Sequence, residues 1–147
     1  MRTTCHAVIL PLAVLALIPP AAFASEHVVC PTEIQQASLK LTNTPAQWTP
    51  YVASPIYLHA AAAAAGPPET LAQLRPDRST YADGKPSWKV TYNLEGHFPR
   101  GKWLECSYGT FNQIVLSKRL PDTTTSCTIT YRKGEHAGEH ALKIACR

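Results

Sequence analysis

Hydrophobic and polar residues alternate along much of the second half of the chain. In residues 88–94 and 103–108 every second side chain is apolar or aromatic. This period of two, rich in aromatic and β-branched residues, predicts strands. The pattern predicts further strands over residues 113–118, 127–131 and 142–146. Turn-forming segments separate them, so the simplest arrangement is an antiparallel meander whose inner face carries the cysteines.

The first half is less regular. Residues 34–41 fit a short strand or a short helix. Residues 56–65 are ambiguous, because six alanines with high helix propensity follow the strand-like Ile-Tyr-Leu-His. A Gly-Pro-Pro-Glu sequence predicts one or two helical turns over residues 69–75, and the polar residues 77–86 predict a loop. We therefore expect a mainly β fold: a single-domain antiparallel sheet or small sandwich with one short helix.

The N-terminus has the pattern of a secretory signal peptide. Arg2 supplies the positive charge, residues 7–18 are apolar, and Ala22-Phe23-Ala24 is a cleavage sequence. We expect residues 1–24 to be removed and residues 25–147 to form a single β-rich domain. The apolar run is too short to span a bilayer, and no second one follows. The sequence predicts a periplasmic or secreted protein without a transmembrane span.

Charge argues against nucleic acid as a partner. The mature 123 residues carry a net charge of +3, and their basic residues are scattered in pairs rather than gathered in a stripe with interleaved aromatics. The oligomeric state is not indicated by the sequence.

Four cysteines remain in the mature chain, and an even number in an exported protein predicts disulfides. A hairpin turning through residues 134–138 places Cys127 opposite Cys146. In a plain meander Cys106 lies two strands from Cys127, roughly 10 Å away, which is too far to bond. This favours Cys127–Cys146 with Cys30–Cys106. The rival pairing, Cys30–Cys146 with Cys106–Cys127, stays open if the sheet folds into a sandwich.

The sequence Gly134-Glu-His-Ala-Gly-Glu-His140 contains two histidines and two glutamates. His136 and His140 are weak candidates for a Zn²⁺ or Cu²⁺ site, and a polar hairpin turn is the simpler interpretation. No cofactor is predicted. The chain has no G-x-S-x-G or H-E-x-x-H motif, and its cysteines are assigned to disulfides, so an enzyme is not expected.

Two segments are candidates for a protein-binding surface. The loop over residues 96–103 combines an aromatic ring with cations, and the proline-rich segment near residue 50 has two large aromatics. The simpler alternatives are a strand connection with a buried phenylalanine, and aromatics that cover the core. The candidate residues are His97, Phe98, Arg100, Lys102, Trp48 and Tyr51.

Spaced motifs support a resemblance. Cys30-Pro31-x-x-Ile34, a Gly-Pro-Pro at 66–68, Trp103-Leu-x-Cys106-x-Tyr108, Cys127-x-x-x-Tyr131 and Ile144-x-Cys146-Arg147 together resemble a family of small exported proteins of Gram-negative bacteria without established catalytic residues. The chain departs from it in having alanines, instead of bulky aromatics, before Gly-Pro-Pro. The resemblance implies a periplasmic location, a β-rich domain and an immunity-type role near contact-dependent secretion systems.

The sequence therefore predicts a periplasmic inhibitor that binds another envelope protein, such as a toxic cell-wall-degrading enzyme, through a loop that enters the enzyme's cleft. The alternative is a protein that binds a small ligand or an envelope component, which requires a concave apolar pocket.

Overall fold

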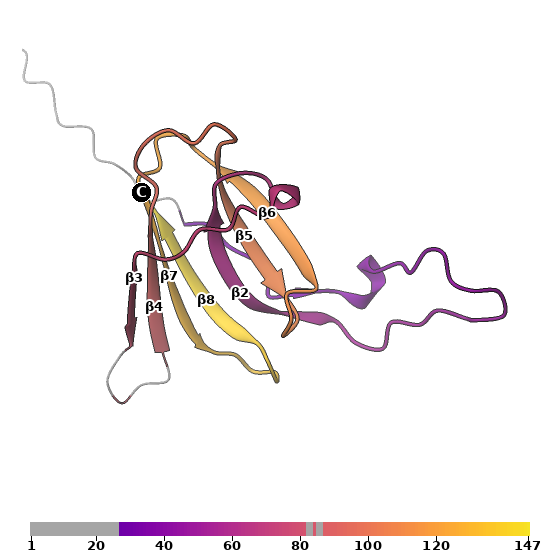
Figure 1. Ribbon diagram of the computed structural model, residues 1–147. Coiled ribbons are helices and arrows are strands. Elements are labelled where there is room, and N and C mark those ends of the chain that lie inside the picture. The colour runs from indigo at the N-terminus through magenta and orange to yellow at the C-terminus, as the bar shows by residue number, and fades with distance from the viewer. Residues whose placement is uncertain (1–26, 82–83, 85–86) are drawn as a thin grey trace, which may run out of the picture.

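The computed structural model describes residues 27–81, 84 and 87–147; the predicted signal peptide lies outside these residues. Two four-stranded antiparallel sheets face each other (Figure 1). Sheet one has the order β1 (Glu33–Ile34), β2 (Ile56–Ala64), β5 (Lys102–Tyr108) and β6 (Ile114–Leu120). Sheet two has the order β3 (Arg78–Tyr81), β4 (Ser87–Asn93), β7 (Ser126–Lys133) and β8 (His140–Cys146). The mainly β fold is therefore confirmed.

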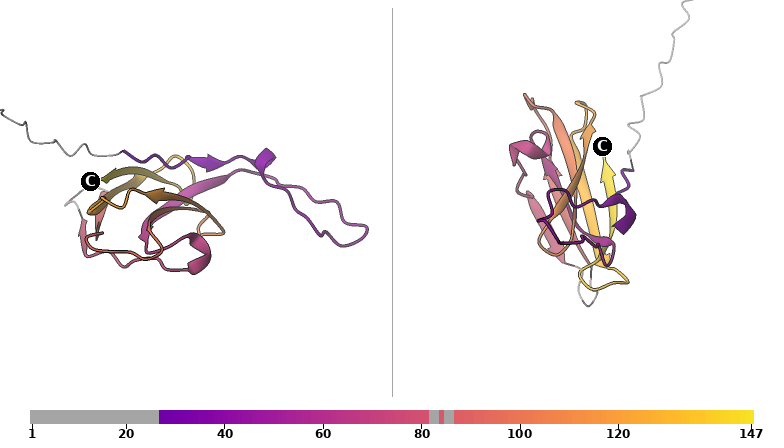
Figure 2. Two further views of the ribbon diagram at one scale, coloured as in Figure 1. Left: turned by 90° about the horizontal axis from the view of Figure 1, so that it is seen from above. Right: turned by 90° about the vertical axis from the view of Figure 1, so that its right-hand side faces the viewer.

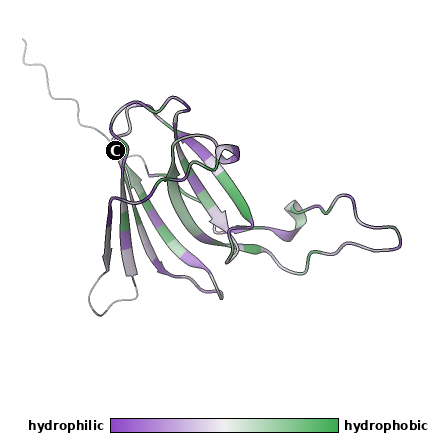
Figure 3. Ribbon diagram, viewed as in Figure 1, coloured by the Kyte–Doolittle hydropathy of each residue, from purple (hydrophilic) through white to green (hydrophobic). Residues whose placement is uncertain are grey.

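One hydrophobic core lies between the sheets. In β4, β7 and β8, alternate residues are buried toward the other sheet, and Figure 3 shows hydrophobic and hydrophilic residues alternating along β8. The largest fully buried side chains come from both sheets and from the segments that follow their strands: Tyr108, Leu94, Leu104, Leu120 and Ile129. Strand β2 packs against β7 and β8, so it joins the two layers.

The five strands predicted from alternation are present, and residues 56–64 resolve as strand β2. Alanines favour a helix in isolation. Here the alanine run pairs with β5 on one side, its end hydrogen-bonds to residues 72–74 on the other, and most of it is buried. On the outer face, Gln73 Nε2 donates a 2.9 Å hydrogen bond to Glu105 Oε2, and Gln73 also forms a β-bridge with Ala64. The small alanine side chains leave room for this contact.

Three predicted details are wrong. Helix covers only Pro68–Thr70 (η2, a 3-10 helix), because residues 72–74 hydrogen-bond to the end of β2 instead. The expected loop over 77–86 contains strand β3, whose residues are all exposed and therefore carry no alternation signal. The plain meander fails because the chain crosses from sheet two to sheet one between β4 and β5, and back again between β6 and β7.

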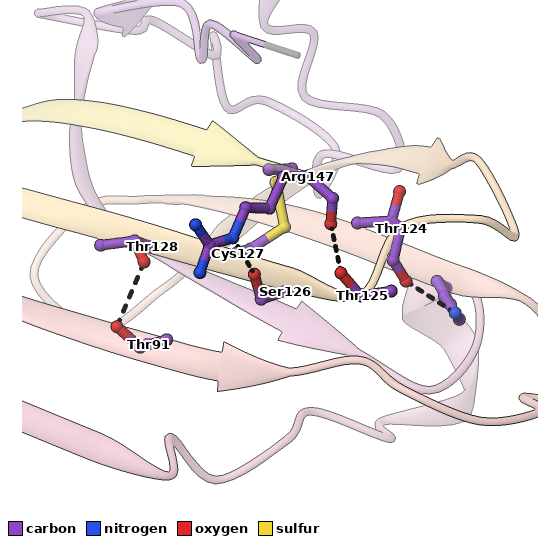
Figure 4. The surroundings of a disulfide bond; sticks show 9 residues. Thr91, Thr124, Thr125, Ser126, Cys127, Thr128 and Arg147 are labelled. Atoms are coloured by element: carbon purple, nitrogen blue, oxygen red, sulfur yellow. Dashed lines mark hydrogen bonds between the residues drawn. A yellow bond between two sulfur atoms is a disulfide. The ribbon is translucent and has the colours of Figure 1, made fainter. Parts of the chain in front are cut away.

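Both preferred disulfides are present. Cys127 lies directly opposite Cys146 in the β7–β8 hairpin, with 4.1 Å between their Cα atoms. Around it, Thr125 Oγ1 donates to the carbonyl of Arg147, and Arg147 Nε donates to Ser126 Oγ (Figure 4). The second disulfide joins Cys30 to Cys106 across 76 residues of sequence. It fixes the N-terminal segment against β5.

Candidate protein-binding surface

A long arm projects from one end of the sandwich. Residues 35–55, called the arm below, connect β1 to β2, which pair at its base through Ile34 and Ile56. Hairpin strands are usually joined by two to five residues, and much longer connections in compact domains often have a function. Figure 1 and the left view of Figure 2 show the arm reaching away from both sheets. Legs of roughly seven extended residues reach on the order of 20 Å.

Three large hydrophobic side chains stand exposed on the arm. The exposed fractions are 59% for Leu41, 74% for Trp48 and 79% for Tyr51. The arm also has a single charged residue, Lys40. Protein interfaces are enriched in aromatic residues and depleted in charge at their centres, so this composition is typical of a contact surface.

The backbone of the arm makes few hydrogen bonds. Within the described residues its backbone–backbone bonds are local, such as the 3.2 Å bond from the Trp48 amide to the Pro45 carbonyl, and none joins the arm to the sheets. Asn43 and Gln47 both have positive φ and turn the chain at the tip. The arm thus offers a partner many unused donors and acceptors.

A groove of about 460 Å³ lies between the two legs of the arm. Its walls are residues 36–37 and 39–42 on one leg, which begins with the 3-10 helix η1 (Gln36–Ser38), and residues 50–52 on the other. The lining is mostly apolar and includes Leu39, Pro50 and Val52.

Two turns surround the base of the arm. The turn between β5 and β6 exposes Phe111, and the β7–β8 turn carries Gly138. A smaller hollow of about 190 Å³ is shared by these two turns and residues 55–57. The arm and the two turns therefore form one continuous end of the molecule.

A cluster of histidines and aromatic rings holds this end together. His59 Nδ1 donates a 2.7 Å hydrogen bond to the Gly138 carbonyl, and His140 Nδ1 donates to the carbonyl of His59. The ring of His136 stacks on Tyr57 with 3.9 Å between centroids. These contacts attach the β7–β8 turn of sheet two to β2 of sheet one.

Glu139 gives the β7–β8 turn its shape. Its carboxylate accepts hydrogen bonds from the backbone amides of His136 and Glu135 and from His136 Nδ1. These bonds lower the pKa of Glu139, the His136 backbone amide contributing most.

His136 and His140, the two candidate metal ligands, each use Nδ1 for a hydrogen bond within the protein. Among the described residues, no group of three His, Cys, Asp or Glu is arranged to hold a metal.

The other predicted contact loop lies at the opposite end of the sandwich, where β5 begins. His97 and Arg100 are exposed beside a hollow of about 340 Å³. Lys102 is 4% exposed, and its Nζ donates 2.7 Å hydrogen bonds to the carbonyls of Asp122 and Thr124. Phe98 is half-buried above it, with Nζ 5.5 Å from the ring centroid. Lys102 and Phe98 therefore build the loop, while His97 and Arg100 face solvent.

The structure thus separates the predicted binding residues into two sets. Trp48 and Tyr51 lie on the arm, and the 96–103 loop lies at the far end. Sequence reasoning did not single out Leu41 and Phe111, although both follow from the same composition argument once their segments are known to be exposed. The role of His59 could not be found, because its partners are 79 and 81 residues away.

An exposed arm on a rigid, disulfide-linked scaffold is typical of a protein that acts by binding another protein. A family model matches residues 53–147, well over half of the chain, and its description is "Type VI secretion system Tli immunity protein". The chain belongs to this family, and the expected resemblance to an immunity-type family is confirmed. No curated protein and no solved structure shows significant similarity to it. No helix in the described part of the chain is long and apolar enough to cross a membrane.

Proposed function

We propose that the chain is exported to the periplasm and there neutralises a toxic effector enzyme, delivered by a type VI secretion system, by binding it without catalysis. The match to the immunity family over residues 53–147 carries the proposal, because an immunity protein acts on a partner effector. The signal-peptide pattern and the two disulfides support export, since disulfides persist in oxidising compartments.

A rigid scaffold favours inhibition by binding. The Cys30–Cys106 disulfide, the shared core and the histidine cluster fix the end of the sandwich that carries the arm, and Cys127–Cys146 joins β7 to β8 at the other end. A preorganised surface loses little conformational entropy on association, which favours slow dissociation. An inhibitor that must remain bound while the effector is present needs that property.

The test uses a candidate effector enzyme taken from the genes that flank the gene for this chain. That effector is directed to the periplasm of a sensitive bacterium, with and without this chain. We expect growth to be restored by the full-length chain and lost again when residues 1–24 are deleted. A stable complex with the purified effector is expected as well, and failure of the full-length chain to protect or to bind would contradict the proposal.

The same cells report what the effector attacks. Release of peptidoglycan fragments identifies a cell-wall enzyme, as the sequence analysis expects, and loss of intact phospholipid identifies an enzyme that attacks the membrane. In either case the signal is expected to disappear when this chain is present in the periplasm.

A further inference from the structure

We infer that the arm is the anchor that this chain inserts into a recess of its effector, and that it determines which effector is recognised. This inference rests on the proposed function and names the surface that performs it. The arm is convex and narrow, so the complementary surface is concave. Its tip carries Trp48, and the adjoining leg carries Tyr51.

The composition of the arm suits complete burial in another protein. Burying a charged group without a partner is costly, and the arm has only Lys40 to place. Trp48 and Tyr51 combine a large apolar area with one polar group each, the property that makes these residues frequent hot spots. The recess that fits them is apolar at the depth of the indole.

The arm is held ready for binding. Pro45, Pro50 and Pro55 fix φ at three positions, which reduces the freedom that the segment would lose in a complex. Its first leg is attached through the Cys30–Cys106 disulfide and β1, and its second leg continues into β2. The arm thus starts from two fixed points on one rigid body.

The unused hydrogen-bonding groups point to an extended contact. A segment without internal ladder bonds can pair its amides and carbonyls with those of a partner, as extended peptides do at a sheet edge. The groove between the legs then accepts one apolar side chain from the wall of the recess. Main-chain bonds and the two aromatic anchors together account for both affinity and orientation.

The extent of the family match supports a role in specificity. The match begins at residue 53, so Leu41, Trp48 and Tyr51 all precede it, while seven of the eight strands lie within it. A scaffold common to the family with a separate arm allows different members to recognise different effectors. Exchange of the arm should therefore transfer recognition.

Two other binding partners for the arm, a membrane surface and a second copy of this chain, are less consistent with these observations. A membrane surface attracts segments that combine aromatics with several basic residues, and the arm has one lysine. A second copy of the chain would need a recess of its own to receive the arm. The hollows described outside the arm measure about 190 to 340 Å³, which is too small for an arm of this length.

The structure offers matched controls for an alanine test. Tyr51 and Tyr81 are both 79% exposed, but Tyr81 lies on β3 of sheet two. We compare Trp48→Ala, Tyr51→Ala and Tyr81→Ala by calorimetric titration into the catalytically inactivated form of the effector against which this chain protects. Loss of a hot-spot aromatic weakens binding by about 30-fold or more, which is the expected effect of each arm variant. Tyr81→Ala should change affinity by less than about threefold, and all three variants should unfold at the denaturant midpoint of the unaltered chain.

A photoreactive amino acid in place of Trp48 identifies what the arm contacts. The expected product is a crosslink to the effector. A crosslink between two copies of this chain, or Trp48-dependent sedimentation with vesicles of phosphatidylethanolamine and phosphatidylglycerol, would overturn the inference. Binding by the arm variants as tight as that of the unaltered chain would overturn it too, while leaving the immunity function intact. If the unaltered chain does not bind the effector, the proposed function itself fails.

Recognition is tested by moving the arm. Another family member in which residues 35–55 of this chain connect β1 to β2 should gain affinity for this chain's effector. A chimera that folds and retains both disulfides, yet binds only its original effector, would show that the arm does not determine recognition.

Discussion

The hydroxyl of Tyr131 donates a 2.6 Å hydrogen bond to the carbonyl of Ala61 and joins the two sheets at the centre of the core. The backbone amide of Ala61 in turn donates a 3.2 Å hydrogen bond to the hydroxyl oxygen of Tyr131. The Tyr131 ring also stacks on Trp88, with 4.7 Å between centroids. Strand β2 is thereby fixed to sheet two as well as to β5, and the arm emerges from the first residues of β2.

Tyr131→Phe is expected to lower the free energy of unfolding by about 1–3 kcal/mol, because the buried amide and carbonyl of Ala61 lose their partner. Urea denaturation of the variant measures this change. Tyr81→Phe, at an exposed position, serves as the control and should leave the midpoint unchanged. Equal midpoints for both variants would show that the hydroxyl does not join the sheets.

Lys102→Met is expected to destabilise the chain by about 1–3 kcal/mol. The unbranched apolar part of the side chain is kept, but the carbonyls of Asp122 and Thr124 lose the ammonium that donates to both. Lys89→Met, at an exposed lysine of β4, is the matched control. If Lys102→Met instead weakens effector binding without changing stability, the far loop belongs to the interface.

The two disulfides should differ in their contribution to stability. In the chain-entropy model, a loop closed over 76 residues contributes about 4.5 kcal/mol and one closed over 19 residues about 3 kcal/mol. Replacing Cys30 and Cys106 by serine should therefore lower the denaturation midpoint more than replacing Cys127 and Cys146. The Cys30/Cys106 variant should also lose effector affinity, because the first leg of the arm is released.

Two tyrosines should titrate at unusually high pH. Burial raises the pKa of Tyr92 and of Tyr108 from 10.0 to about 12, and for Tyr92 the neighbouring Tyr131 adds to the shift. In the unfolded chain both would ionise near pH 10. Their contribution to stability is therefore fully present below pH 10 and is lost as the pH rises through 12. Ultraviolet absorbance of tyrosinate checks the titration, and a single transition near pH 10 for all six tyrosines would contradict it.

Alternation along the chain was sufficient to predict the strands that face the core, and the β7–β8 hairpin shows why. Its turn residues fix the register, so the opposition of Cys127 to Cys146 and of Tyr131 to Leu142 follows from the sequence alone. The buried alanine strand shows the limit of propensity. Its conformation depends on β5 and on residues 72–74, which are distant in sequence or not recognisable as partners.

The location of the arm could not be predicted for a related reason. Trp48 and Tyr51 are equally compatible with covering a core and with standing in solvent, and the choice depends on whether the sheets are already covered. Here β2 is already covered by β7, β8 and the segment at residues 72–74, so the arm is not needed to cover it. The 96–103 loop lies at the other end because it connects β4 of sheet two to the start of β5 in sheet one, whereas the arm connects β1 to β2.

Protection through binding by the arm is tested most directly by the affinity of the unaltered chain and of Trp48→Ala for the effector. We expect a tight one-to-one complex for the unaltered chain, and for Trp48→Ala an affinity lower by about 30-fold or more with unchanged stability. Equal affinity of the two proteins for the effector would contradict it.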